Sequence, residues 1–256
     1  MIPPNLFDLS GKIALVCGAS RGIGESISTM LAAYGALVIV SGRKIEGCEA
    51  VAAKIRADGG RAEARACHIG DLAQIAALFE DIEATHGRLD VLVNNAAINP
   101  YMGPAIDTDP AVFQKTVDVN VRGPFYCSAQ AVRLMRKHGG GSIVNVASVN
   151  AIAPGQYQGV YSLTKAALVS MTLTFARESA AAGIRVNALV PGPTDTRLAA
   201  ALIHSKEAMQ TILPRLPFGR VAQPDEMAGA VLYFASAAAS FTTGACLTVD
   251  GGFLLS

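Results

Sequence analysis

Apolar and polar residues follow two different periods along this chain. The segment 12–18 (KIALVCG) is apolar without polar alternation and ends at a glycine, which is typical of a strand buried on both faces. The segment 22–34 places apolar residues every three or four positions, and this spacing predicts a helix. The same succession repeats along the chain. Further strands are predicted at 36–41, 61–67, 89–94, 142–148, 184–190 and 245–249. Further helices are predicted at 46–58, 72–86, 110–120, 123–137, 157–182 and 224–237.

Seven apolar strands joined by helices predict a parallel sheet with helices on both faces. Right-handed crossovers then give a doubly wound, Rossmann-type α/β fold. No linker, charge run or low-complexity segment divides the chain, so we expect one domain over residues 1–256. The least regular region is about 191–217, where prolines surround a weak helical pattern, and we expect a substrate loop there.

Composition narrows the classes of partner. Hydrophobic residues make up 51% of the chain and charged residues 16%, which suits a large core. The net charge of +1 predicts neither nucleic acid nor an anionic membrane as a partner. The first residues lack the pattern of a signal peptide, and no apolar run is long enough to span a membrane. The five scattered cysteines form no CxxC pair, and the four histidines have no metal-binding spacing. We therefore expect a cytoplasmic protein with reduced thiols and no metal.

A glycine-rich turn, Gly18-Ala-Ser-Arg-Gly-Ile-Gly24, lies where the first predicted strand ends and the first helix begins. Glycines let the backbone approach a pyrophosphate, and the helix N-terminus offers unpaired N–H groups. The spacing differs from GxGxxG, but the strand–turn–helix context predicts a dinucleotide site. The residues expected to form it are Gly18, Ser20, Arg21, Gly22, Ile23 and Gly24.

The end of the second predicted strand indicates which dinucleotide binds. An NAD enzyme usually places an acidic residue here to bind the ribose 2′-hydroxyl. The segment Val40-Ser41-Gly42-Arg43-Lys44 has no acid, and Arg43 together with Arg21 suits a 2′-phosphate. We therefore expect NADP(H) to be preferred over NAD(H), with Ser41 and Arg43 in the site. The alternative is that Arg43 and Lys44 only solvate a loop.

Three residues suggest proton transfer next to this cofactor. Tyr161 and Lys165 are four positions apart on a predicted helix and point the same way, and Ser148 ends the fifth predicted strand. A free tyrosine has a pKa near 10, and a nearby ammonium favours its phenolate. Tyr161 can then exchange a proton with a carbonyl or alcohol oxygen that Ser148 holds. Taken singly, each residue has an ordinary explanation, as a surface pair or a helix cap. Together with the glycine turn they predict hydride transfer between a carbonyl compound and an alcohol.

These segments, taken in order, resemble the short-chain dehydrogenase/reductase family along essentially the whole chain. The glycine turn is similar to the family's TGxxxGIG turn, with Cys17 in place of threonine. Asn94-Asn95-Ala96-Ala97 resembles its NNAG segment, and Val249-Asp250-Gly251-Gly252 resembles its closing turn. Pro191-Gly192-Pro193-Thr194-Asp195-Thr196 resembles the segment that contacts the nicotinamide carboxamide.

The resemblance implies roles for particular residues. It implies a catalytic tetrad of Asn120, Ser148, Tyr161 and Lys165, in which Lys165 also binds the nicotinamide ribose and Asn120 holds a water in a proton relay. It implies a homotetramer in which the helices after the fourth and fifth strands form one interface. Further cofactor-binding residues that it implies are His68, Ile69, Asn94, Ala96, Tyr161, Lys165, Pro191, Gly192, Thr194 and Thr196.

Three positions depart from the family pattern. Ala97 replaces the glycine of the NNAG segment. Cys17 lacks the hydroxyl that normally ties the glycine turn to the Asn94 region, which puts that brace in doubt. His68 stands where the family often has an aspartate for the adenine amino group, and Asp71 is a candidate substitute. His68, with the later segment NNAAINPYMG, resembles the NADP-dependent carbonyl reductases that act on ketones and aldehydes. The segments 99–102, 150–157 and 198–213 are mostly small or apolar, and they favour an apolar carbonyl or alcohol substrate.

Two alternatives share these motifs. A 3-oxoacyl carrier-protein reductase should present a basic patch near the cleft, for which the candidates are Arg122, Arg133, Arg136 and Lys137. A non-catalytic NADP-binding regulator would have no need of the four tetrad residues together. A serine hydrolase is disfavoured, because no G-x-S-x-G elbow surrounds Ser148.

Overall fold

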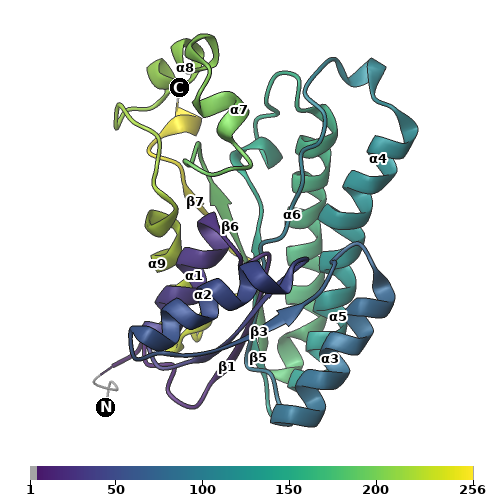
Figure 1. Ribbon diagram of the computed structural model, residues 1–256, viewed down its shortest axis with the longest axis vertical. Helices are drawn as coiled ribbons and strands as arrows, with labels where there is room; N and C mark the ends of the chain where they lie inside the picture. The colour runs from purple at the N-terminus through teal and green to yellow at the C-terminus, as the bar shows by residue number, and fades with distance from the viewer. Residues whose placement is uncertain (1–4, 256) are drawn as a thin grey trace.

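Seven strands form one parallel sheet in the computed structural model, which describes residues 5–255 (Figure 1). The strands are β1 (Ile13–Cys17), β2 (Leu37–Gly42), β3 (Arg61–Ala66), β4 (Val91–Asn94), β5 (Gly141–Val146), β6 (Ile184–Pro191) and β7 (Cys246–Val249). Their order across the sheet is β3-β2-β1-β4-β5-β6-β7. The predicted doubly wound α/β fold is confirmed. Met1–Pro4 and Ser256, at the ends of the predicted domain, lie outside the described residues.

Helices cover both faces of the sheet. On one face lie α1 (Gly22–Ala33), α2 (Ile45–Ala57) and α9 (Ala228–Ala235), and on the other lie α3 (Leu72–His86), α5 (Gly123–Arg136) and α6 (Gly159–Ser179), as Figure 1 shows. Side chains alternate along a strand, so each strand contributes to both layers. In β1, Ala14 and Val16 pack under the first set, whereas Leu15 and Cys17 pack under the second. This explains why the strand sequences are apolar throughout.

The chain reverses its direction of winding between β1 and β4. From β1 it runs outward to β2 and β3, and β4 then pairs with the other side of β1. The register sets Cys17 of β1 beside Ser41 of β2 and Asn94 of β4. The loops that follow these three residues therefore leave the sheet side by side at its carboxyl edge. This edge, at the point where the strand order reverses, is where open α/β sheets bind ligands.

The two helices predicted at 110–120 and 123–137 form one continuous helical run. The helix α4 (Pro110–Val117) passes into a π-helical turn, Asp118–Arg122, which leads directly into α5. Pro124 has no N–H to donate, and a wider turn lets the helix continue past it. The two predicted helices are therefore present as α4 and α5, and the π turn joins them. Asn120 lies inside the π turn and is fully buried.

The predicted substrate loop at about 191–217 is partly helical. It contains the last residue of β6, the short helices α7 (Ala200–Ile203) and α8 (Lys206–Ile212), and a 3₁₀ turn, Leu213–Arg215. In Figure 1 these helices lie above the ends of β6 and β7. Other 3₁₀ segments lie at Ala105–Asp107, Val149–Ala151, Ala180–Ala182, Pro224–Met227, Ala237–Ala239 and Phe253–Leu255. No helix within residues 5–255 has both the length and the apolar composition that a membrane span requires.

Candidate active site

The glycine turn after β1 has a backbone that other residues would not fit. Gly18 has φ +77°, and a Cβ on it would lie 2.6 Å from Cα of Ala96. A Cβ on Gly24, in the first turn of α1, would lie 2.3 Å from the carbonyl oxygen of Gly18. The N–H groups of Gly18 and Ala19 donate to the carbonyl oxygen of Ser41, at 2.8 and 2.9 Å. The turn is thus held against the end of β2, with its glycines where close packing requires them.

Asn95 supplies the brace that was in doubt because of Cys17. Its side-chain Nδ2 donates to the carbonyl oxygen of Gly18 at 2.8 Å and so ties the glycine turn to the segment after β4. Cys17 itself is buried in the core, and burial together with contact with Cys127 raises the pKa of its thiol. Sequence reasoning missed Asn95, although it lies next to Asn94 in the segment that carries the resemblance.

Two guanidinium groups flank the turn. Arg21 is the residue before α1, Arg43 follows β2, and both side chains are exposed. Within residues 5–255 the structure gives neither of them an ion pair or a side-chain hydrogen bond. The two segments touch, because a Cβ on Gly42 would lie 3.6 Å from Oγ of Ser20. Arg21 comes directly after Ser20, and Arg43 comes directly after Gly42. The two arginines therefore start from neighbouring points of the backbone.

These residues fit a nicotinamide dinucleotide. The glycine turn 18–24, here called the glycine cradle, has no room for a Cβ at Gly18 or Gly24. The N-terminus of α1 has no side-chain cap. The hydroxyl of Ser41 is buried and has no hydrogen-bond partner among the described residues. Free backbone N–H groups and a hydroxyl can bind phosphate and ribose oxygens, and the two arginines add positive charge.

The segment after β3 is ordered by its own hydrogen bonds. Nδ1 of His68 accepts from the N–H of Gly70 at 3.1 Å, and the N–H of His68 donates to Oε1 of Gln74 at 2.8 Å. Asp71 caps α3 by accepting from the N–H groups of Ala73 and Gln74. These hydrogen bonds lower the pKa of its carboxyl, and its oxygens are engaged at the helix end. The suggestion that Asp71 replaces the missing adenine ligand therefore finds no support.

Ile69, the other predicted residue of this segment, is buried against the start of α5. A Cβ on Gly123 would lie 2.2 Å from the carbonyl oxygen of Ile69, so only glycine permits this approach. Ile69 thus fixes the position of the loop after β3 against the π turn that holds Asn120.

Ser148, Tyr161 and Lys165 lie together at the carboxyl end of β5. The side chain of Ser148 forms a hydrogen bond with Tyr161, and its Oγ also accepts from the N–H of Asn150 at 3.2 Å. Nζ of Lys165 lies 5.5 Å from the centre of the Tyr161 ring and donates to the carbonyl oxygen of Val146 at 2.8 Å. The structure therefore brings the phenol, the hydroxyl and the ammonium group into one cluster.

Burial dominates the protonation of these groups. It raises the pKa of Tyr161 to about 12, although the hydrogen bond from Ser148 acts in the other direction. It lowers the pKa of Lys165 to about 7. We expected the charge of Lys165 to lower the pKa of Tyr161 and so to favour its phenolate. In the chain without a cofactor, the loss of solvation on burial has the larger effect on this pKa. At neutral pH Tyr161 is therefore a proton donor.

Asn120 links the loop after β4 to α6. Its Oδ1 accepts from the N–H of Ile98, and its Nδ2 donates to the carbonyl oxygen of Ile98, both at 2.8 Å. Nδ2 also donates to Oγ1 of Thr164 at 3.1 Å, and Thr164 in turn donates to the carbonyl oxygen of Tyr161 at 2.7 Å. Thr164 was missed by the sequence analysis, although its place between Tyr161 and Lys165 could have indicated it.

Asn94 is engaged inside the protein. Its Nδ2 donates to Oδ1 of Asn145 at 2.8 Å and to Oγ of Ser128 at 3.0 Å, and Asn145 donates to Oγ1 of Thr172 at 2.9 Å. This buried chain joins β4 and β5 to α5 and α6. Asn94 thus supports the end of β4 from beneath, whereas the neighbouring residues Asn95 and Ala96 contact the glycine turn.

The segment after β6 reaches from the closing turn to the glycine turn. A Cβ on Gly192 would lie 2.6 Å from Cα of Asp250, and one on Gly22 would lie 3.5 Å from Cγ2 of Thr196. Oγ1 of Thr194 donates to the carbonyl oxygen of Gly192 at 2.9 Å, and Pro191 ends β6. The predicted cofactor residues of this segment are therefore brought to the same edge as the glycine turn.

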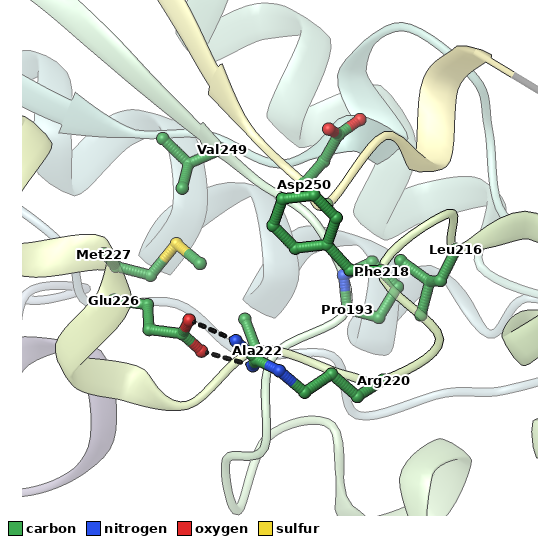
Figure 2. Close-up of a pocket in the computed structure, with 10 residues that line it drawn as sticks. Pro193, Leu216, Phe218, Arg220, Ala222, Glu226, Met227, Val249 and Asp250 are labelled. Atoms are coloured by element: carbon green, nitrogen blue, oxygen red, sulfur yellow. Dashed lines mark hydrogen bonds and ion pairs between the residues drawn. The ribbon is translucent and has the colours of Figure 1, made fainter.

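A small cavity of about 70 Å³ lies where this segment meets the closing turn (Figure 2). Arg220 and Glu226 form a two-pronged ion pair along its wall, with both N–O distances at 2.7 Å. Ser148, Tyr161 and Lys165 do not line this cavity. It is separate from the cluster of reactive groups and too small for a dinucleotide. The other lining residues are Pro193, Leu216, Phe218, Ala222, Met227, Val249, Asp250 and Gly251.

The fold and the site define the class of nucleotide-dependent oxidoreductases built on a doubly wound sheet. The sequence profile of a family described as enoyl-(acyl carrier protein) reductase matches residues 18–254. A cis-4-hydroxycyclohexanecarboxylate dehydrogenase from Sinomonas cyclohexanicum is 39% identical over 94% of this chain and 96% of its own length. Dehydrogenase/reductase SDR family member 4 from Oryctolagus cuniculus is 37% identical over 95% of this chain and 94% of its own length.

A solved structure extends the likeness to three dimensions. A gluconate 5-dehydrogenase from Burkholderia cenocepacia, in complex with NADP and tartrate, is 33% identical and superposes with a TM-score of 0.94. The match covers 98% of both chains. This protein belongs to the short-chain dehydrogenase/reductase family, as the sequence resemblance indicated.

Proposed function

We propose that this protein is an NADP(H)-dependent oxidoreductase that interconverts a ketone or aldehyde and the corresponding alcohol. One observation carries the proposal. The hydroxyl of Ser148, the phenol of Tyr161 and the ammonium of Lys165 converge at the sheet edge that also holds the glycine cradle. Proton-transfer groups beside a dinucleotide site are what carbonyl reduction and alcohol oxidation require.

The roles of the residues follow from their contacts. A bound nicotinamide would supply the hydride to the carbonyl carbon, or accept it from the alcohol carbon. Ser148 holds the substrate oxygen, and Tyr161 gives it a proton in reduction and takes that proton back in oxidation. Lys165 fixes the helix that carries Tyr161 against β5 through its bond to Val146. Asn120, through Thr164, fixes the same helix from the other side and is the proposed start of a relay to solvent.

The charges around the glycine turn support NADP(H) over NAD(H). No acidic residue lies at the end of β2 to bind a ribose 2′-hydroxyl. Arg21 and Arg43 are both exposed, and they lie on two neighbouring segments. A 2′-phosphate would give both guanidinium groups a partner. The related gluconate 5-dehydrogenase structure holds NADP.

The entrance to the site supports an apolar carbonyl substrate. Exposed apolar side chains occur on all three segments expected to form the pocket, and substrate burial would cover them. The Sinomonas relative acts, by its name, on the hydroxyl group of a hydroxycyclohexanecarboxylate, a six-membered carbon ring that also carries a carboxylate. We therefore propose that this protein acts on cyclic or similarly bulky ketones, with 191–217 as the substrate loop. The exposed apolar residues are Met102, Ile152, Tyr157, Leu198 and Leu213.

A 3-oxoacyl carrier-protein reductase is the second candidate. The description of the matching family names a carrier-protein substrate, with an enoyl rather than a 3-oxoacyl group. The basic patch that such an enzyme should present is divided in this structure. Arg122 lies at the start of α5 and contacts Asp118 and Gly70, whereas Arg136 and Lys137 lie at the other end, about 20 Å away along the helix. Lys137 is paired there with Glu83. We therefore rank the ketone reductase first, and both above a non-catalytic NADP-binding regulator, which would not need the tetrad.

A substrate panel tests the proposal. Purified protein is incubated with NADPH or NADH and with cyclohexanone, substituted cyclohexanones, an aromatic ketone and a carrier-bound 3-oxoacyl thioester, and the loss of reduced nicotinamide is followed. Ketone-dependent oxidation of NADPH is the expected result, with a loss of about 10²–10⁴ in rate for Tyr161→Phe. Turnover of the carrier-bound substrate alone would favour the second candidate. NADPH binding without any turnover would favour the regulator.

We further propose that the protein assembles into a homotetramer. Phe125 and Tyr126 on α5, and Leu163 and Leu173 on α6, expose apolar side chains on neighbouring helices. A second copy of the chain would cover this surface. Light scattering after gel filtration tests the tetramer, and Leu173→Glu should shift the mass toward smaller species.

A further inference from the structure

Three amide side chains from two loops, the one after β4 and the one between β5 and α6, meet at the N-terminus of α6. Oε1 of Gln158 accepts a hydrogen bond from Nδ2 of Asn99 at 3.3 Å and another from Nδ2 of Asn150 at 3.2 Å. Asn99 belongs to the loop after β4, and Asn150 to the turn after β5. Because a carboxamide oxygen has two lone pairs, one residue can hold both neighbours at once. We infer that Gln158 is a positioning residue that fixes the substrate wall by joining these loops.

The backbone joins the same segments. The N–H of Gly103 donates to the carbonyl oxygen of Tyr157 at 3.0 Å, and Gly103 forms an isolated parallel bridge with Gln158. Tyr157 has φ +60°, a left-handed conformation that is strained for a tyrosine. Such strain persists only where the surroundings hold the backbone, and it concentrates at functional sites. The turn 155–158 is therefore held against the loop 99–103 by side-chain and backbone contacts together.

Gln158 connects the reactive groups with the entrance. It is the residue just before α6 and precedes Tyr161 by three residues. Asn150, held by Gln158, donates its own N–H to Oγ of Ser148. At the outer end, Asn99 contacts the sulfur of Met102, one of the exposed apolar residues of the entrance. A change at Gln158 should therefore move the wall of the pocket without touching the reacting atoms.

The inference rests on the proposed function and names how that site selects its substrate. With the two loops joined, a bulky ketone meets a fixed wall and is oriented by it. Without the shared acceptor, the loops separate and a bulky substrate loses its orientation, whereas a compact one is still held by Ser148 and Tyr161 alone. The expected consequence is a loss confined to substrates that reach the wall.

The test compares Gln158→Leu, which has no acceptor, with Gln158→Glu, which keeps one. Gln114→Leu is the matched control, because Gln114 is exposed on α4 and also loses one side-chain hydrogen bond, to Asp118. The probes are 4-tert-butylcyclohexanone and cyclohexanone, which differ only in bulk far from the carbonyl. For Gln158→Leu, KM for the bulky ketone should rise about tenfold, and kcat for cyclohexanone should stay within about twofold. Gln158→Glu should restore most of the lost affinity, and Gln114→Leu should resemble the unmodified protein.

Equal losses for both ketones, no change in KM, or the same effect in Gln114→Leu would overturn the inference. Hydrogen exchange gives a second readout that needs no substrate. In Gln158→Leu, peptides that contain Gly103 and Asn150 should exchange faster than in Gln114→Leu, while the middle of α6 stays protected. Unchanged exchange in both peptides would refute the joining role even in an inactive protein. Absence of all ketone turnover in the unmodified protein would instead refute the proposed function.

Discussion

Nζ of Lys165 lies 2.8 Å from the carbonyl oxygen of Val146, so a buried ammonium fastens α6 to the end of β5. Only 2% of the Lys165 surface is exposed, and no carboxylate forms an ion pair with it among the described residues. Burial without a counter-ion lowers the pKa of the lysine to about 7 and makes its charged form costly. The contact that positions Tyr161 is therefore also a source of instability, and this has consequences that can be measured.

Lys165→Met should alter the pH dependence of stability. In the folded protein the lysine has a pKa of about 7, below the 10.5 of a free side chain, so the penalty is complete below pH 7. It disappears as the pH rises toward the value of the unfolded chain, because the folded state binds fewer protons over this window. The unmodified protein should therefore gain on the order of 1–3 kcal/mol relative to Lys165→Met between about pH 7 and about pH 9.5. Urea unfolding at the two pH values measures the difference, and a pH-independent difference would show that burial of the ammonium does not destabilise the fold.

The two directions of the proposed reaction should differ in their response to pH. Tyr161 has a pKa of about 12 and is protonated at neutral pH, which suits donation to a carbonyl. Alcohol oxidation needs the deprotonated form, so kcat/KM for oxidation should rise up to about tenfold per pH unit between pH 7 and 9. The rate of ketone reduction should rise far less over that range. Initial rates in both directions with the same cofactor pair decide the matter, and parallel profiles would argue against Tyr161 as the titrating group.

Arg43→Ala should weaken the binding of NADPH more than that of NADH. A charged hydrogen bond to the 2′-phosphate is worth roughly 1.5–3 kcal/mol, which corresponds to about a tenfold to hundredfold change in Kd. Lys44→Ala is the matched control, because Lys44 is the next residue and is also exposed. Titration of the reduced-nicotinamide fluorescence gives the Kd of both cofactors for the unmodified protein and for each variant. An equal loss for both cofactors, or none, would show that Arg43 does not select the phosphate.

Gly24→Ala should damage cofactor binding, whereas Gly229→Ala should not. A Cβ at position 24 would lie 2.3 Å from the carbonyl oxygen of Gly18, so the glycine turn must shift to accommodate it. At Gly229, in α9, a Cβ would meet nothing within 4 Å, and alanine should stabilise the helix by up to about 1 kcal/mol. Calorimetric titration with NADPH should show at least a roughly tenfold weaker Kd for Gly24→Ala alone. Unchanged binding in that variant would mean that the turn is not the cradle.

Local pattern was enough to predict the fold and the positions of the reactive groups. Strands that are apolar on both faces, each followed by a helical period, admit few arrangements besides a doubly wound parallel sheet. A glycine turn after the first strand, and a tyrosine and lysine four apart on a helix, then place their groups at one edge. These features depend on residues close together in the sequence, so the sequence alone was sufficient to predict them.

Contacts between distant segments were decided only by the tertiary structure. The brace from Asn95 to Gly18, the inward engagement of Asn94 and the shared acceptor at Gln158 each join loops that follow different strands. The π turn that carries Asn120 likewise follows from how the helix passes Pro124. The physical reason is that a side-chain amide can pair with many partners. Its choice depends on which loops the sheet brings within about 3 Å, and no local pattern contains that distance.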